Sequence, residues 1–294
     1  MPGFIRNNKP YLALFVGVSF MGFAAIFIKS ANAPGLVTVF YRMTIASIVI
    51  FFPFYLNIRK IKTPLNRKGL WLAILAGIFF GIDLSFWSTG VVLINNATLP
   101  TLFANLAPVW VGFGAMLIFK EKPKANFWAG VLVALLGMTL FIFNQLYGKG
   151  NLWKGIVLGS IAGMFYAAFY LVAQKGRMLL NTISFLFIST LSSALIIFLF
   201  MLISGYSFFE YDRHSYLMFL GIGLGGQVIA WYMINYAQGF LPATIVAPTL
   251  LLQPIITATM AILILKERLT MLQLIAGLII IVGIYLVNYK KHKT

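Results

Sequence analysis

Residues 97–144 read "ATLPTLFANLAPVWVGFGAMLIFKEKPKANFWAGVLVALLGMTLFIFN", and residues 243–288 read "ATIVAPTLLLQPIITATMAILILKERLTMLQLIAGLIIIVGIYLVN". The two stretches align without a gap at the single offset that places Ala243 on Ala97. Shared apolar letters alone are weak support, but a proline, a Lys–Glu pair and a glycine at one offset indicate an internal repeat. The matched pairs are Thr98/Thr244, Pro108/Pro254, Lys120/Lys266, Glu121/Glu267 and Gly137/Gly283. We therefore divide the chain into two related halves, 1–146 and 147–294.

The composition predicts that the chain lies in a membrane. Of its 294 residues, 61% are hydrophobic and only 9% are charged, whereas a soluble domain carries about a quarter charged residues. Apolar runs of about 18 residues or more, the length of a membrane-spanning helix, recur from end to end. We predict an all-α integral membrane protein with ten transmembrane helices in two inverted five-helix repeats. The expected spans are 11–30, 36–56, 69–90, 97–119, 125–146, 152–174, 182–204, 215–238, 243–265 and 271–289.

The charge distribution predicts the orientation of these spans. The chain has 22 Lys and Arg against five acidic residues, a formal charge of +17. The basic residues gather in short loops between apolar runs, which indicates the positive-inside bias rather than a nucleic-acid surface and places both termini in the cytoplasm. Because each half has an odd number of spans, "KEK" at 120–122 faces the cytoplasm and "KER" at 266–268 faces outward. Inverted repeats are typical of alternating-access transporters, whose substrate binds near the midplane between the halves.

These residues resemble a known family, the ten-span EamA-type members of the drug/metabolite transporter superfamily. The resemblance covers essentially the whole chain and is carried by two copies of a "P…(L/I)…KE(K/R)…G" pattern, at 108–137 and 254–283, and by "YRMTIAS" at 41–47. It implies a ten-helix inverted-repeat fold whose central cavity is lined largely by spans 3, 4, 8 and 9, with parts of spans 1 and 6. Members of the family export amino acids and other small metabolites, or import quaternary amines and nucleotide-like compounds.

Polar side chains recur at helical spacing within several spans, where they must face protein or water. In the span 215–238, Gln227, Trp231 and Asn235 are four residues apart and therefore share one face. A single Thr or Ser in such a place is interpreted as an interhelical hydrogen bond of about 0.6–2 kcal/mol. Three large hydrogen-bonding groups exceed what helix packing needs and favour a cavity wall. The expected lining of the substrate cavity is Asp83, Trp87, Asn105, Tyr166, Tyr170, Gln227, Trp231, Asn235 and Gln253.

Asp83, in "GIDLSFWSTG" at 81–90, is an acidic residue inside a predicted span. At about 1.5 Å per residue, Asp83 and Arg42 lie at similar depths below the outer surface. An unpaired charge there costs several kcal/mol or more, so a structural Asp83–Arg42 ion pair is one hypothesis, with Lys29 as an alternative partner. Two functional hypotheses compete with it: Asp83 carries a proton for coupling, or it binds a cationic group of the substrate with help from nearby Trp rings.

Pro108 and Pro254 interrupt the fourth and ninth spans at matching positions. A proline inside a helix removes a backbone hydrogen bond and frees a carbonyl one turn earlier. The two prolines are interpreted either as hinges or as static kinks.

Other functional classes lack the residues that they need. No His or Cys and no pair of carboxylates lies within a predicted span, so we expect no catalytic residue, no enzyme activity, no metal and no cofactor. Glu210, Asp212 and His214 cluster in "FFEYDRHS", but this spacing matches no known metal site and predicts an exposed charged loop. No "GxxxxGK[ST]" motif is present, which argues against ATP hydrolysis by this chain.

We therefore expect a secondary transporter for a small polar metabolite, exporting amino acids or related compounds by alternating access. The alternative is an uptake carrier for a quaternary amine such as choline, which Trp87, Trp231, Tyr166 and Tyr170 could enclose, or for a nucleotide-like metabolite. The expected location is the plasma membrane or a bacterial inner membrane, as a multi-pass protein. The expected partners are the small-molecule substrate, the lipid bilayer and protons as candidate coupling ions, with no nucleic acid, and we expect a functional monomer.

Overall fold

The computed structural model describes residues 8–60, 64–94, 98–141, 152–253, 255–256, 259 and 270–288. The described residues are almost entirely helical. Seven segments are long and apolar enough to cross a membrane, and three shorter apolar helices accompany them, at Lys9–Gly22, Ala125–Phe141 and Ala243–Leu252. Together they account for the ten spans predicted from hydropathy, so the predicted all-α membrane architecture is confirmed.

The first half contains α1 to α6, with bounds Lys9–Ser30 (α1), Gly35–Lys60 (α2), Arg67–Ile94 (α3), Thr98–Ala104 (α4), Ala107–Phe119 (α5) and Ala125–Phe141 (α6). The predicted span 97–119 is thus two helices, because the chain breaks at residues 105–106. Pro108 lies in the first turn of α5, where its missing N–H breaks no helical hydrogen bond. Helix α5 ends where Lys120 turns left-handed, at φ 54°.

The second half contains α7 (Leu152–Leu179), α8 (Thr182–Ser204), α9 (Arg213–Gly221), the π-helix η2 (Ile222–Ile229), α10 (Ala230–Gln238), α11 (Ala243–Thr249), the 3₁₀ turn η3 (Leu250–Leu252) and α13 (Met271–Asn288). Side-chain caps start two of these helices: Asn181 accepts from the amide of Ser184 at α8, and Asp212 accepts from that of Ser215 at α9. Helix α7 continues five residues beyond the predicted end at 174 and therefore includes Arg177.

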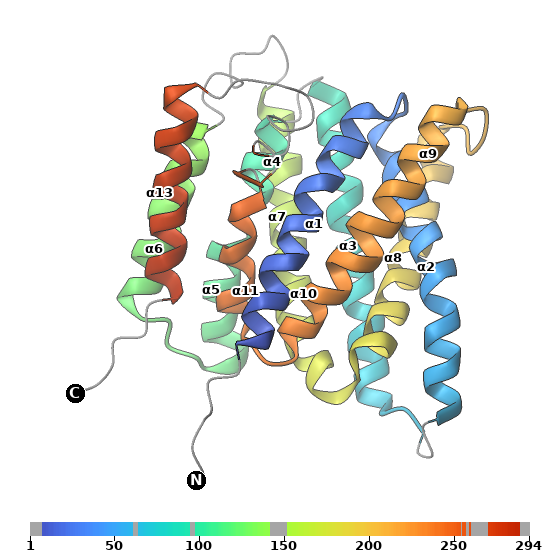
Figure 1. Cartoon of the computed structure of the whole chain (residues 1–294), viewed down its shortest axis with the longest axis horizontal. Coiled ribbons are helices and arrows are strands. Elements are labelled where there is room, and N and C mark those ends of the chain that lie inside the picture. Colours follow the sequence, from blue (N-terminus) through green and yellow to red (C-terminus); the bar gives the residue numbers. More distant parts are fainter. Residues whose placement is uncertain are drawn as a thin grey trace.

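The helices run up and down through one bundle, with α6 beside α13 at one edge and α2 beside α8 toward the other (Figure 1). Helix α3 packs against α7 and α8, while α1 packs against α10 and η2. The offset of the sequence repeat places α3 on the segment that includes α10, and α7 on α1. The α3–α7 contact therefore corresponds to the α10–α1 contact, as expected for a two-fold repeat. Helix α1 begins and helix α13 ends at the same end of the bundle (Figure 1). We call this end, where Lys9, Lys60 and Asn288 lie, the terminal face, and the end with Ser30 and Gly35 the opposite face.

The glycines of the repeat pack at the α6–α13 contact. A Cβ on Gly283 would lie 2.6 Å from the carbonyl oxygen of Gly130, and one on Gly137 would lie 3.0 Å from that of Ala276. The offset of the sequence repeat places Gly283 on Gly137 and Ala276 on Gly130, so these are the same contact with the halves exchanged. Helices α6 and α13 run in opposite directions (Figure 1), so the two-fold axis relating them lies across the helices and the halves are inverted.

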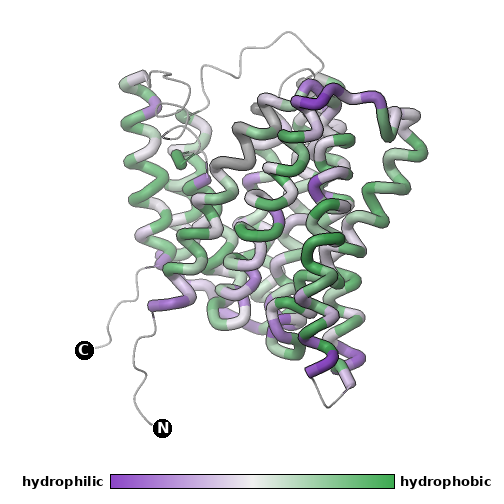
Figure 2. The backbone as a smooth tube through the Cα atoms, turned by 45° about the vertical axis from the view of Figure 1, so that its right-hand side comes forward, coloured by the Kyte–Doolittle hydropathy of each residue, from purple (hydrophilic) through white to green (hydrophobic). Residues whose placement is uncertain are grey.

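The outer surface of the bundle suits a bilayer. Apolar segments cover the middle of the molecule, and polar segments gather toward its two ends (Figure 2). Leu117 and Ile203 are 82% and 84% exposed, and many other large apolar side chains are exposed as they are, which suits an apolar surrounding medium. The terminal face carries most of the described basic residues, namely Lys9, Arg59, Lys60, Arg67, Lys68, Lys120, Lys122, Lys124, Lys175 and Arg177.

Candidate functional site

A group of polar side chains is buried where both halves meet. Helices α2 and α3 of the first half supply Arg42 and Asp83, and η2 of the second half supplies Gln227. Arg42 is 6% exposed, Asp83 5% and Gln227 1%. All three lie well inside their spans, away from both faces. Charged groups at such a depth are rare and mark substrate or ion pathways.

The π-helix η2 shapes the contact with Arg42. Its sequence, IGLGGQVI, is rich in glycine, and a Cβ on Gly223 would lie 2.8 Å from the Ile45 side chain, so α2 approaches closely. Arg42 Nε donates to Gln227 Oε1 at 2.9 Å, and Nη2 donates to the Gly226 carbonyl at 3.4 Å. π-Helical turns are rare and occur often at functional sites, where they redirect backbone and side chains.

The hypothesis of a direct Asp83–Arg42 ion pair needs correction. Within the described part of the chain, the Asp83 carboxyl makes no hydrogen bond and has no ion-pair partner within 4.0 Å. The charge of Arg42 still acts electrostatically on Asp83. The physical reason is that Gln227 and the Gly226 carbonyl already accept from Nε and Nη2 of the guanidinium. The Asp83 carboxyl therefore lies near the Arg42 cation but forms no ion pair with it.

Aromatic rings of the second half pack beside Asp83. Tyr170 donates its hydroxyl hydrogen to the Tyr166 hydroxyl at 2.7 Å, and both phenols interact electrostatically with Asp83. The Trp231 ring centroid lies 4.6 Å from that of Phe80 and 6.4 Å from that of Tyr166. The rings therefore fill the space between α3, α7 and α10 by contacting one another. They do not form an open cage in this conformation.

Other predicted lining residues form a second group one turn along α3 from Asp83. Trp87 Nε1 donates to Thr101 Oγ1 at 2.9 Å, and Asn105 Nδ2 donates to the Thr101 carbonyl at 2.9 Å. The first bond ties the end of α3 to α4, and the second ties the break before α5 back to α4. Gln253 is half-buried after η3, and Pro254 lies outside the described residues. The structure thus brings together Asp83, Tyr166, Tyr170, Gln227 and Trp231, with Trp87 and Asn105 adjacent to them.

Asn235 lies further along α10, toward the terminal face, beside a residue that hydropathy did not single out. Arg177 of α7 is 8% exposed, and its Nε donates to the Asn235 carbonyl at 2.7 Å. The predicted span ends at residue 174, so the sequence predicts that Arg177 is a charged residue in the following loop. The signal that could have identified it is the Asn181 capping residue a few positions later, which leaves no room for a solvated loop before α8.

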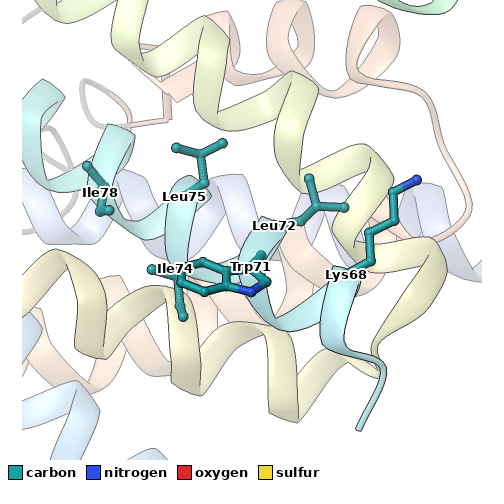
Figure 3. Close-up of a pocket in the computed structure, with 6 residues that line it drawn as sticks. All are labelled: Lys68, Trp71, Leu72, Ile74, Leu75 and Ile78. Atoms are coloured by element: carbon teal, nitrogen blue, oxygen red, sulfur yellow. The ribbon is translucent and has the colours of Figure 1, made fainter.

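Two hollows among the described residues lie away from the central group. A groove of about 290 Å³ is lined by residues of α3 alone, and in Figure 3 it runs from Lys68 and Trp71 to Ile78. Trp71 is 71% exposed, so this groove faces the bilayer. A hollow of about 120 Å³ lies at the opposite face between α2, α3 and α8, beside Ser88 and Tyr206. Asp83 and Arg42 themselves are buried, at 5% and 6% exposed.

Comparison with known proteins matches both halves to one family. The model of the EamA-like transporter family matches residues 8–143 and again residues 153–289. An uncharacterized transporter of Archaeoglobus fulgidus is 24% identical over 98% of this chain and all of its own length. Uncharacterized transporters of Synechocystis sp. and Haemophilus influenzae are 25% and 27% identical, covering 80% and 74% of this chain and 71% and 74% of theirs.

A solved structure described only as "Crystal structure of protein" has the same fold. It superposes with a TM-score of 0.78 at 16% identity, covering 95% of this chain and 96% of its own. The repeated family match, the full-length relatives and the inverted helical fold agree. The chain belongs to the EamA-like transporter family.

Proposed function

We propose that this transporter exports amino acids or related zwitterionic metabolites by alternating access. The observation that carries the proposal is the pair of opposite charges, Asp83 and Arg42, buried together without contacting each other. A zwitterion presents an ammonium and a carboxylate, and these two groups complement a carboxylate and a guanidinium. Because each protein charge is costly in the membrane without a partner, a substrate that satisfies both is bound favourably.

The position of the charges also suits a carrier. Arg42 and Asp83 come from the first half, while Gln227, Tyr166 and Trp231 come from the second. In inverted-repeat carriers the substrate site lies at such a junction, and rocking of the halves exposes it to each side in turn. The energy then comes from the substrate gradient, from exchange or from protons, and Asp83 is the group on which a coupling proton would bind.

A quaternary amine fits the same place less well. The carboxyl of Asp83 and the rings of Tyr166 and Trp231 suit a cation. However, Arg42 repels a permanent cation, and such a substrate offers nothing to its guanidinium. The zwitterion is therefore the better match to the described side chains.

The distribution of basic residues supports the orientation. The terminal face carries most of the described Lys and Arg, and positively charged loops remain in the cytoplasm. We accordingly place both termini in the cytoplasm and the chain in a plasma membrane or a bacterial inner membrane. Export then moves substrate from the terminal face to the opposite face.

Counterflow in proteoliposomes tests the function. Vesicles containing the purified protein are loaded with one unlabelled compound from a panel of neutral, acidic and basic amino acids, choline and nucleotides, and uptake of the same labelled compound is followed. We expect saturable uptake for one group of amino acids, and none with empty liposomes. Saturable uptake of choline but of no amino acid contradicts the proposal, and flux that does not saturate for any compound contradicts carrier function.

A further inference from the structure

The terminal end of α7 holds α10 through a buried cation. Arg177 Nε donates to the Asn235 carbonyl at 2.7 Å, and Nη2 donates to Thr182 Oγ1 at 2.7 Å. Its Nη1 donates to the Leu180 carbonyl. The Asn235 carbonyl is in the last turn of α10, where carbonyls lack partners within the helix and the helix dipole favours a cation. Within the described residues, Arg177 has no ion-pair partner within 4.0 Å, so backbone and hydroxyl oxygens hold its charge.

One turn earlier, the same helix holds the start of α11. Gln174 Oε1 accepts from the amide of Ala243 at 2.8 Å, the first residue of α11. Its Nε2 donates to Glu121 Oε1 at 3.4 Å, in the Lys–Glu pair that follows α5. Gln174 and Arg177 therefore hold both sides of the turn between α10 and α11. Gly239 in this turn is close to the guanidinium, since a Cβ there would lie 2.8 Å from Arg177 Nη2.

Buried polar atoms without partners line α10 above this turn. They are Trp231 Nε1, Asn235 Oδ1 and both amide atoms of Gln238. The three residues are spaced four and three apart, so they follow one face of the helix. Buried polar side-chain atoms normally have a hydrogen-bond partner, and a run of such atoms on one face needs an explanation. Two donors and two acceptors in a row suit water or a polar solute.

The helices that these contacts join belong to two different packing groups. Helix α7 packs along α3 and α4, whereas α10 packs along α1 and η2. The repeat relates the α3–α7 pair to the α10–α1 pair. A rocking motion of one group against the other therefore separates α7 from α10, and at the terminal face it must break the contacts of Arg177 and Gln174.

We propose that Arg177 and Gln174 form the gate at the terminal face, and that the face of α10 from Trp231 to Gln238 lines the path that opens there. The gate is closed in this conformation. Opening exchanges its hydrogen bonds for water and hydrates the unpartnered atoms of Asn235 and Gln238. The path offers uncharged donors and acceptors, which solvate a zwitterion without trapping it. This inference rests on the proposed transport function but not on the identity of the substrate.

The absence of cysteine in the chain provides the test, because a single introduced cysteine is then the only thiol. Gln238→Cys is treated, in vesicles with the terminal face outward, with a charged thiol reagent that does not cross membranes. The rate of labelling is compared between the native background and the backgrounds Gln174→Met and Arg177→Met. We expect slow labelling in the native background and labelling about tenfold faster or more in each variant, as loss of a hydrogen bond of this kind implies.

The control variant and the results that would contradict the gate are both read from thiol labelling and need no transport measurement. Ile229→Cys, at the end of the π-helix that leads into α10 and 38% exposed, should stay unlabelled in all backgrounds. Thermal unfolding verifies that each variant is folded. If Arg177→Met does not fold, the comparison is made with Gln174→Met alone. Equal labelling of Gln238→Cys in the native and Gln174→Met backgrounds, whether fast or absent, overturns the gate. Labelling needs no substrate, so a failed amino-acid counterflow leaves this result interpretable.

Discussion

The guanidinium of Arg42 donates its Nε hydrogen to Gln227 Oε1 across 2.9 Å, and this bond joins α2 of the first half to the π-helix of the second. It holds the cation near Asp83, whose carboxyl has no hydrogen bond or ion pair among the described residues. Gln227 therefore positions Arg42, and its substitution should affect stability and transport in separable ways.

Replacing Gln227 with Leu should destabilise the folded protein. The change leaves the Arg42 Nε buried without its acceptor, and a hydrogen bond to a charged group contributes about 1.5–3 kcal/mol. Gln227→Glu should instead preserve stability, because a carboxylate accepts from the same nitrogen, but it should reduce transport by neutralising Arg42. Thermal unfolding and counterflow of the two variants are the measurements. A Gln227→Leu variant as stable as the native protein would show that the bond contributes nothing.

Substituting Gly283 should loosen the contact between α6 and α13. A Cβ there would lie 2.4 Å from the Ala134 amide nitrogen and 2.6 Å from the Gly130 carbonyl oxygen. Both neighbours are backbone atoms, so the helices must move apart, and overpacking of this kind costs about 1–3 kcal/mol. Gly283→Ala should therefore lower the unfolding temperature in detergent.

Gly277 provides the matched control on the same helix. A Cβ at Gly277 would meet its nearest neighbour, an atom of Ile255, at 3.9 Å, which is ordinary contact. Gly277→Ala should thus be neutral or slightly stabilising, because alanine is the better helix former. Equal effects of the alanine at 277 and at 283 would contradict the close α6–α13 contact.

Asp212 should make the stability of the opposite face depend on pH. Hydrogen bonds from Ser215, and from Asn32, hold the pKa of the Asp212 carboxyl below its usual value of about 3.8. A lowered pKa in the folded state means that the contribution is complete above the usual value and is lost as the pH falls through the lowered one. The unfolding temperature of Asp212→Ala should therefore be below that of the native protein at neutral pH. The gap should narrow as the pH falls below 3.8, to what the uncharged cap contributes.

Asp212→Asn separates the cap from the charge. An amide oxygen caps the helix as well as a carboxylate and does not titrate. The difference between the Asn and Ala variants should thus stay constant over the same acidic range. A native–Ala difference that is equally independent of pH would argue against a role for the ionised carboxylate.

Much of the fold could be predicted because membrane spans follow hydropathy and the repeat follows matched residues. The helix α8 begins and ends where hydropathy placed it, at 182 and 204. Hydropathy does not reveal two other features of the fold. The π-helix at 222–229 has the same apolar pattern as an α-helix, so periodicity does not distinguish them. Helix α7 continues through Arg177 because carbonyl oxygens, rather than water, receive its hydrogens.

The sequence could single out members of the buried polar group, but not the contacts that they make. Asp83 and Gln227 stand out as polar groups within apolar spans, and the structure places both near Arg42. Depth alone suggested that Asp83 and Arg42 form an ion pair. Which acceptor a guanidinium contacts depends on the direction of its side chain and on the path of the neighbouring backbone. Here the wide turn at Gly226 provides a carbonyl that hydropathy cannot reveal.

The most direct test of a zwitterion site compares a substrate with its own fragments. Once counterflow has identified an amino acid, its affinity and that of the analogue lacking the amino group are measured by thermal stabilisation of the native protein and of Asp83→Asn. We predict that the substitution weakens binding of the amino acid about tenfold or more, as for loss of a buried charge partner, and leaves that of the analogue unchanged. Equal weakening of both compounds, or of neither, would contradict a role for Asp83 in binding the ammonium.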